Sequence, residues 1–198
     1  MNDDVPQWAD AGLSQSLPSV RVAGESENTE FKEAFPEQAH RLAKEIAALA
    51  TSGGGRLFLG VDDAGRVVGL AADTGQRRDE LIERACSIAR TVKPVPRCSF
   101  AFAVQDSNIV LVITVEKPDA PIYYYEYRPY LRDGRRSRPA EPEEVQELVW
   151  RHPSSEYKRR LERLRIEGLE RQSQESAERL AMISEHLQAQ RRRFGGAP

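Results

Sequence analysis

Two pairs of acidic residues in this chain have the types and spacing that a divalent-cation site requires. Glu25 and Glu30 lie five residues apart at the start of a strand-like segment, and Asp62 and Asp63 directly follow the apolar run 56–61. If the two segments form neighbouring strands, these carboxylates converge at one edge of the sheet. Mg²⁺ and Mn²⁺ prefer such oxygen ligands, and a bound cation polarises a phosphoryl oxygen. The pattern predicts a metal site formed by these four carboxylates.

Lys32 shares the exposed face of its strand with Glu30, because side chains alternate along 30–35 and Phe31 lies on the other face. Its ammonium could offset charge that develops on a phosphate, so the group as a whole suits phosphodiester cleavage. The alternative interpretation is structural. Acids are common at strand ends, and aspartate is common in turns of the Asp-Asp-x-Gly type.

A second candidate site is an arginine-rich segment with tyrosines before and among its arginines. The arginines are Arg128, Arg132, Arg135, Arg136 and Arg138, and the tyrosines are Tyr123, Tyr124, Tyr125, Tyr127 and Tyr130. Arginine pairs with phosphate through two parallel hydrogen bonds, and an exposed tyrosine can stack on an unpaired base. The segment is therefore a candidate nucleic-acid surface. The alternative is a solvated hairpin whose tyrosines pack within the sheet.

The glycine-rich stretch TSGGGR, residues 51–56, resembles a nucleotide-binding loop only superficially. A phosphate cradle follows a strand and begins a helix, whereas this stretch follows a helical pattern and precedes an apolar strand. It also lacks the G-K-[ST] ending of a P-loop. We interpret it as a tight connection from a helix to a strand.

The elements that must position these residues alternate between strand and helix patterns. We expect an α+β domain with a small mixed sheet and two main helices over residues 18–152, after a flexible lead-in over 1–17. Strands are expected at 30–35, 56–61, 66–70, 98–104 and 109–115, with two short ones around Arg128. Helices are expected from about Pro36 to the glycine run, across 81–92 and across 142–150.

Residues 153–198 form a separate segment rich in Arg, Glu, Gln and Leu, in which 154–193 read as one long helix. A heptad seam steps through Ile166, Leu169, Ser173, Ser176, Leu180, Ile183 and Leu187. This seam is typical of a coiled coil and predicts a homodimer through residues 154–193. The alternative is a solvated helix that folds back on the domain.

Composition excludes several classes of protein. The chain of 198 residues has 31 acids and 29 bases, so its net charge of −2 excludes a uniformly basic nucleic-acid coat. The charge is uneven, with −6 over residues 1–127 and +4 over 128–198. No apolar run is long enough to span a bilayer, and no secretory signal is evident. The chain has only two cysteines, so we expect both to be reduced and the protein to be cytoplasmic. The three histidines have no nucleophile nearby in sequence.

Three separated blocks, over residues 18–150, resemble the Schlafen-type AlbA domain. They read ESENTEFKEAF, KEIAALATSGGGRLFLGVDDAGRVVGL and APIYYYEYRPYLRDGRRSRPAEPEEVQEL. The resemblance implies an α+β fold related to small dimeric nucleic-acid-binding modules. In Schlafen proteins this domain carries an RNA-cleaving site of two glutamates and one aspartate. The matching positions here are Glu25, Glu30 and either Asp62 or Asp63.

The resemblance leaves three functions open. The first is a nucleic-acid-binding, Mg²⁺- or Mn²⁺-dependent endoribonuclease acting on structured RNA such as tRNA. The second is a non-catalytic DNA- or RNA-binding regulatory module that oligomerises through its C-terminal helix. The third is ATP binding, which the missing P-loop disfavours. The Schlafen endonuclease clamps its substrate with a second half of similar fold, which a homodimer would have to supply here.

Overall fold

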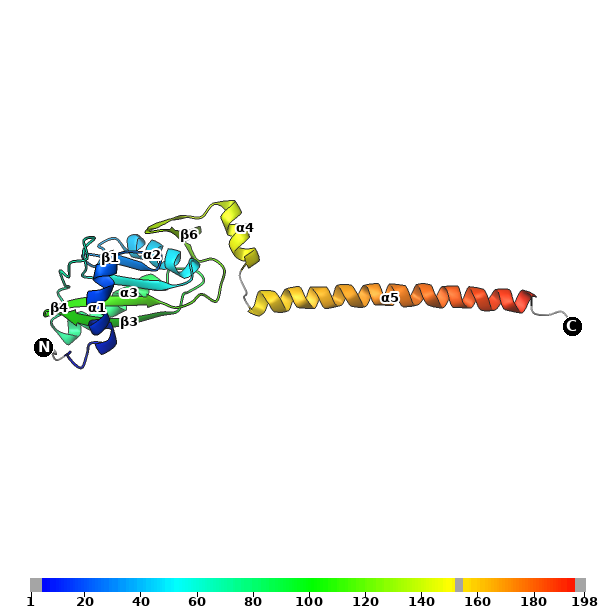
Figure 1. The fold of residues 1–198 in the computed structure, drawn as a ribbon, viewed down its shortest axis with the longest axis horizontal. Helices are drawn as coiled ribbons and strands as arrows, with labels where there is room; N and C mark the ends of the chain where they lie inside the picture. Colours follow the sequence, from blue (N-terminus) through cyan, green and yellow to red (C-terminus); the bar gives the residue numbers. More distant parts are fainter. Residues whose placement is uncertain (1–4, 152–154, 195–198) are drawn as a thin grey trace. The chain divides into compact units, whose positions relative to one another are not determined.

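The computed structural model describes residues 5–151 and 155–194. The chain divides into two compact units, Met1–His152 and Pro153–Pro198, and each is described by itself. The first unit is an α+β domain, as the sequence predicts, and the described part of the second is one long helix (Figure 1).

The centre of the first unit is a four-stranded mixed sheet with strand order β1-β2-β4-β3. Its strands are β1 (Thr29–Lys32), β2 (Gly55–Leu59), β3 (Cys98–Gln105) and β4 (Asn108–Val115). Strand β1 runs parallel to β2, and the other two pairings are antiparallel. The two segments that carry the candidate carboxylates are therefore neighbouring strands, which confirms the condition set by the sequence.

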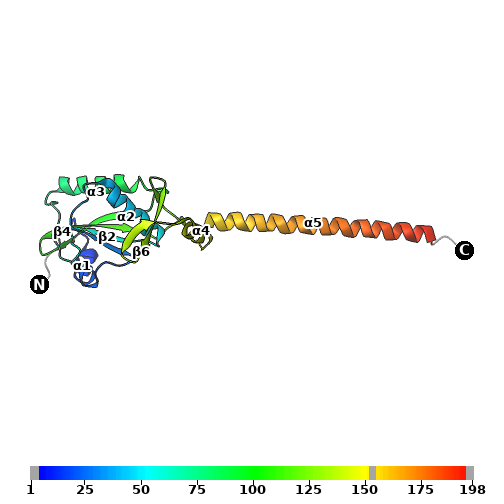
Figure 2. The same ribbon diagram turned by 90° about the horizontal axis from the view of Figure 1, so that it is seen from above.

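Helices cover both faces of this sheet. Helices α2 (Ala39–Thr51) and α3 (Gly75–Ala89) pack on one face, where the larger apolar core lies. Helix α1 (Ala11–Ala23) covers a smaller cluster on the other face that includes Phe31 and Phe58. Figure 2 shows α1 and α3 on opposite sides of the sheet. Because β1 alternates, Phe31 points toward α1 while Glu30 and Lys32 lie on the α2 side.

Helix α1 corrects the expectation of a flexible lead-in over residues 1–17. The Asp10 carboxylate caps the helix by accepting a hydrogen bond from the Leu13 amide at 2.8 Å. Leu13, Leu17 and Val20 then form an apolar stripe that packs on the sheet. Two prolines and several polar residues obscure this stripe in the sequence. The expected strand at 66–70 is also absent, and only an isolated bridge between Val61 and Val67 is formed there.

A second, smaller sheet follows the first in the chain. It has three antiparallel strands, β5 (Tyr124–Tyr125), β6 (Arg128–Asp133) and β7 (Arg136–Pro139), where two were expected. Strand β6 packs against α2, so α2 lies between the two sheets. Helix α4 (Pro142–Arg151) ends the unit. This arrangement brings the arginine-rich segment over the side of α2 that faces away from the main sheet.

The second unit is helix α5 (Ser155–Phe194), a single helix of 40 residues. The described apolar side chains of the predicted heptad seam are all exposed. They are Ile166, Leu169, Leu180 and Ile183, with exposed fractions of 47%, 57%, 67% and 56%. No described helix, α5 included, is both long and apolar enough to cross a membrane.

Candidate functional site

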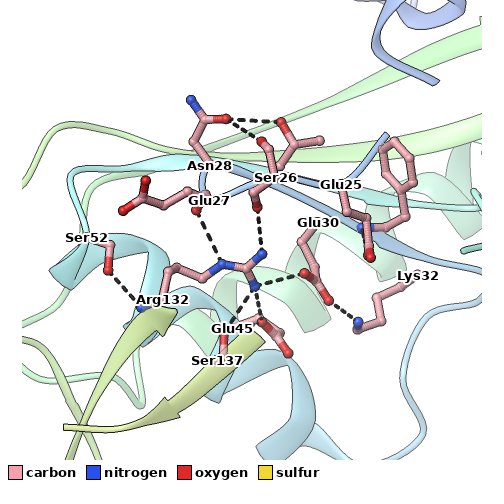
Figure 3. A network of polar contacts seen from close by, with 12 residues as sticks. Glu25, Ser26, Glu27, Asn28, Glu30, Lys32, Glu45, Ser52, Arg132 and Ser137 are labelled. Atoms are coloured by element: carbon pink, nitrogen blue, oxygen red, sulfur yellow. Dashed lines mark hydrogen bonds and ion pairs between the residues drawn. The ribbon is translucent and has the colours of Figure 1, made fainter. Parts of the chain in front are cut away.

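A buried group of charged residues joins strand β1 to strand β6. Arg132 Nη1 donates a hydrogen bond to Glu30 Oε2 at 2.8 Å, and the side chain of Arg132 is 0% exposed. The other Glu30 carboxylate oxygen is paired with the ammonium of Lys32. Figure 3 shows these side chains converging between the two sheets. Both oxygens of Glu30 are therefore already paired with a cation of this chain.

Arg132 uses its guanidinium to connect four segments of the domain. Beyond Glu30 on β1, Nη1 also donates to Glu45 on α2 at 3.0 Å and to Ser137 on β7 at 3.2 Å. Nη2 donates to the Ser26 carbonyl at 2.8 Å, and Nε donates to the Glu27 carbonyl at 3.3 Å (Figure 3). We call Glu30, Glu45, Lys32 and Arg132 the ionic cluster.

The charges of the ionic cluster shift the pKa values of two of its members. Burial lowers the pKa of Lys32, but the hydrogen bond and charge of Glu30, with smaller effects of Glu45 and Glu25, raise it overall. Burial, together with the charge of Glu30, raises the pKa of Glu45 against the opposing effects of Ser137, Lys32 and Arg132. Lys32 is therefore held in its charged form, and Glu45 is protonated more easily than a glutamate in water.

Glu25 caps the open edge of the main sheet. Its Oε1 accepts a hydrogen bond from the Phe31 backbone amide at 3.0 Å. Strand β1 has a neighbouring strand on one side only, so this carboxylate supplies the acceptor that a further strand would provide. Glu25 thus has a structural role close to the ionic cluster, where its charge also acts on Lys32.

Asp62 makes its polar contacts within its own turn. Its Oδ1 accepts hydrogen bonds from the Ala64 and Arg66 amides at 3.0 and 2.8 Å, and its Oδ2 accepts one from Arg66 Nε at 2.7 Å. These bonds, led by the one from the Arg66 backbone, lower the pKa of Asp62. The register places Glu30 opposite Leu57, five residues before Asp62, so the turn lies beyond the end of β1. Asp63 is exposed.

The residues predicted to hold Mg²⁺ or Mn²⁺ do not fit such an ion as they are arranged. The carboxylate oxygens of Glu30 and Asp62 are committed to lysine, arginine and backbone donors, and Asp62 does not join the glutamates. Within residues 5–151 and 155–194, no three His, Cys, Asp or Glu side chains are grouped so as to hold a metal ion. The prediction that these carboxylates converge was therefore wrong. Strands β1 and β2 are neighbours, but Glu30 and Asp62 lie at different positions along them.

The five arginines of the second candidate site separate into two groups. Arg132 is buried and therefore unavailable to a ligand, so the prediction that it contacts nucleic acid was wrong. Arg138 is held by Glu144 through two hydrogen bonds of 2.7 and 2.8 Å and by Asp133 at 2.9 Å. The bond to Arg138 lowers the pKa of Glu144 to about 2. The remaining three are exposed and have no acidic partner among the described residues; they are Arg128, Arg135 and Arg136.

Two residues of the buried network were not recognised in the sequence. Glu45 lies three residues after Leu42 and four before Leu49, on the buried stripe of α2, and a carboxylate at such a position requires a buried partner. The position of Glu45 on this apolar stripe could therefore have been recognised in the sequence. Ser137, which donates to Glu45 and accepts from Arg132, had no comparable signal, because it is one of several polar residues in a hairpin.

Comparisons with known proteins give a family model and a solved structure that match this chain. No curated protein matches it. A crystal structure of the DIP2311 protein from Corynebacterium diphtheriae matches with 24% sequence identity and a TM-score of 0.47, over 69% of this chain and 28% of that protein. This chain thus spans less than a third of the length of DIP2311. The family model described as Schlafen, AlbA_2 matches residues 25–141, which is more than half of the chain. The chain therefore belongs to the Schlafen AlbA_2 family.

Proposed function

We propose that this chain binds nucleic acid through the three exposed arginines of the small sheet, Arg128, Arg135 and Arg136, which we call the arginine surface. Membership of the Schlafen AlbA_2 family indicates a nucleic-acid-related function. The observation that carries the proposal is that these guanidinium groups are exposed and lack acidic partners among the described residues, whereas Arg132 and Arg138 are paired. An unpaired guanidinium offers both of its parallel N–H donors to a phosphate.

The spacing of the arginine surface suits a nucleic-acid backbone. Arg128 begins β6, while Arg135 and Arg136 lie at the turn after it. At about 3.4 Å per residue, the two ends of this strand are roughly 17 Å apart. A span of this length covers more than one phosphate of a nucleic-acid backbone, so the two ends of the arginine surface can contact different phosphates.

Cleavage of structured RNA such as tRNA is a finer hypothesis, and we place binding without cleavage ahead of it. The carboxylates that the family resemblance assigns to a metal are Glu25, Glu30 and either Asp62 or Asp63. Glu30 would have to leave Lys32 and Arg132, and Asp62 would have to leave Arg66, before either could take a cation. No observation favours ATP binding.

Binding is tested by the dependence of affinity on salt. Fluorescence anisotropy with a labelled RNA and a labelled DNA hairpin gives log K against log[salt] for the full chain. The double variant Arg135→Gln/Arg136→Gln should flatten the slope by about 0.7 to 0.9 for each phosphate that it no longer neutralises. Arg77→Gln is the matched control, because Arg77 is exposed on α3 and paired with Asp73. An unchanged slope in the double variant would refute the assignment.

Cleavage is tested separately with labelled tRNA in Mn²⁺ and in EDTA. We expect the tRNA to stay intact in both. Cleavage that EDTA abolishes, and that a folded Glu25→Gln variant lacks, would instead establish the endoribonuclease and overturn our ordering of the two functions. Circular dichroism shows whether the variant is folded.

We also propose that α5 pairs with α5 of a second copy of this chain in a parallel coiled coil. The apolar seam side chains that the structure describes are exposed, and a lone helix gains nothing from presenting them to water. With Ile166 at position a of the heptad, Arg165 occupies g and Glu170 occupies the following e. In a parallel dimer these two positions face each other across the seam, so Arg165 pairs with Glu170 of the second copy, and the reverse. Ser173 and Ser176 make the seam weak.

The coiled coil is tested by sedimentation of the full chain over a range of concentrations. Wild type should show a monomer–dimer equilibrium, and Leu169→Glu/Leu180→Glu should be monomeric. Arg171→Glu, which lies away from the seam, is the control and should dimerise like wild type. A wild type that is monomeric throughout, or a double variant that still dimerises, would refute the proposal.

A further inference from the structure

The turn between β5 and β6 has an unusual composition for its geometry. Tyr125 pairs with Arg128, so only Glu126 and Tyr127 form the turn, with φ of 47° and 62°. Two consecutive left-handed residues define the type I′ hairpin turn, which strongly favours Asn, Asp and Gly. A larger L-residue in this conformation costs roughly 1 kcal/mol or more. The chain therefore accepts a conformational cost to hold a tyrosine here.

Packing does not account for that tyrosine. The Tyr127 side chain is 98% exposed, whereas Tyr123 and Tyr130 of the same segment are 3% and 5% exposed and belong to the core. Strained backbone positions cluster at binding and catalytic sites, so the strain at this exposed ring indicates a binding role and not a stabilising one. Of the tyrosines that the sequence offered for base stacking, Tyr127 is the one whose ring is almost wholly exposed.

The neighbours of Tyr127 indicate what it binds. Arg128 follows it directly and belongs to the arginine surface. The one acid in the turn is Glu126; burial, with a further effect of the Glu126 carboxylate, raises the pKa of Tyr125. An aromatic face beside an exposed guanidinium matches the base and phosphate of one nucleotide.

We propose that Tyr127 is a stacking platform for an unpaired base, with Arg128 on the adjoining phosphate, so that the chain prefers single-stranded segments to continuous duplex. This rests on the proposed function, and it adds the substrate class. Within a duplex each base face is covered by its neighbours, whereas a base in a loop or an overhang can leave the strand and lie on the ring.

The test compares one labelled pyrimidine-rich oligonucleotide as a single strand and annealed to its complement, in RNA and DNA forms. Tyr127→Asn is the informative variant, because Asn suits the left-handed turn and should leave the domain at least as stable as wild type. It should bind the single strand about 5- to 150-fold more weakly, with the salt slope and the duplex affinity unchanged. Tyr127→Phe should retain wild-type affinity, because the ring and not the hydroxyl does the stacking.

The outcomes separate this inference from the proposed function. Loss of single-strand affinity in Tyr127→Asn, rescued in Tyr127→Phe, supports the inference whether RNA or DNA is preferred. Wild-type affinity in Tyr127→Asn, or tighter binding of wild type to the duplex, overturns the inference but leaves the arginine surface standing. Failure of wild type to bind either form overturns both.

Discussion

Removing the Arg132 guanidinium should destabilise the first unit more than removing any exposed arginine. We consider Arg132→Met, which keeps the length of the side chain and deletes its charge. In the native protein this side chain is 0% exposed, and Glu30 and Glu45 beside it are 6% and 17% exposed. The substitution leaves these two carboxylates facing each other, with Lys32 as their remaining partner in the ionic cluster.

The size of the effect follows from burial. Breaking a buried ion pair by deleting one partner costs about 3–5 kcal/mol, because the remaining charge is stranded. Whole domains are stable by about 5–15 kcal/mol, so the variant should lose a large part of the stability of this unit. The triple variant Arg132→Met/Glu30→Gln/Glu45→Gln should recover part of the loss, because its stranded charges are gone.

The assay is urea unfolding of the full chain, followed by far-ultraviolet circular dichroism and tryptophan fluorescence. With m near 2 kcal/mol/M, a loss of about 4 kcal/mol lowers the midpoint by about 2 M. Arg136→Met, on the same hairpin but exposed, is the control and should change stability by less than about 0.5 kcal/mol. Equal effects of Arg132→Met and Arg136→Met, or a triple variant less stable than Arg132→Met, would refute the reasoning.

Three further predictions concern Glu45, the glycine run and Cys98. Because the folded pKa of Glu45 is raised above 4.5, its stabilising contribution is present at lower pH and is lost as the pH rises through that folded value. The stability of Glu45→Gln relative to wild type, from urea midpoints, should therefore increase from about pH 4 to about pH 8; a constant difference would contradict this. Gly55→Ala should cost about 1–3 kcal/mol in the same assay, because its Cβ would lie 2.5 Å from the Asn28 carbonyl oxygen and 2.8 Å from Leu49 Cδ2. Gly75→Ala is the control, because its Cβ would meet only Arg78 Nη2 at an ordinary contact distance of 3.9 Å, and equal effects of the two substitutions would count against the steric argument. Burial raises the pKa of Cys98 to about 12, with Cys86 adding to the shift, so iodoacetamide should label Cys98 in urea but not in the folded protein, as peptide mass spectrometry would show.

Local patterns predicted most of the elements. The apolar runs of β2, β3 and β4 and the apolar stripes of α2 and α3 are continuous enough to be recognised, because each must bury one face in the core. Helix α1 was missed because Pro18 and the serines mask a stripe of only three apolar residues. Its position is set by long-range contacts, such as the bond from the Val104 amide to Ser14 Oγ at 3.0 Å.

The candidate sites were predicted in part. Alternation along β1 correctly put Glu30 and Lys32 on one face and Phe31 on the other. The expectation that this face is exposed was wrong, because the Glu30 side chain is buried against Arg132. The distinction between Arg132 and Arg136 could not be predicted, because both lie in a hairpin that is rich in charge on both of its faces. The register of β6 against β7 determines which of the two arginines is buried. Arg132 shares a face with Tyr130 toward α2, while Arg136 lies opposite Asp133 at the exposed end of the hairpin.

Short-range patterns of apolar and charged side chains were sufficient to predict the fold class and the two groups of charged residues. The family followed from the resemblance of three sequence blocks to the Schlafen-type AlbA domain. The partners of those charges required the folded chain. Glu30 meets Arg132 across 102 residues of sequence, and Arg132 meets Glu45 across 87. The packing of the small sheet over α2 thus converts one predicted phosphate ligand into a buried structural cation, and it leaves Tyr127 and the arginine surface exposed.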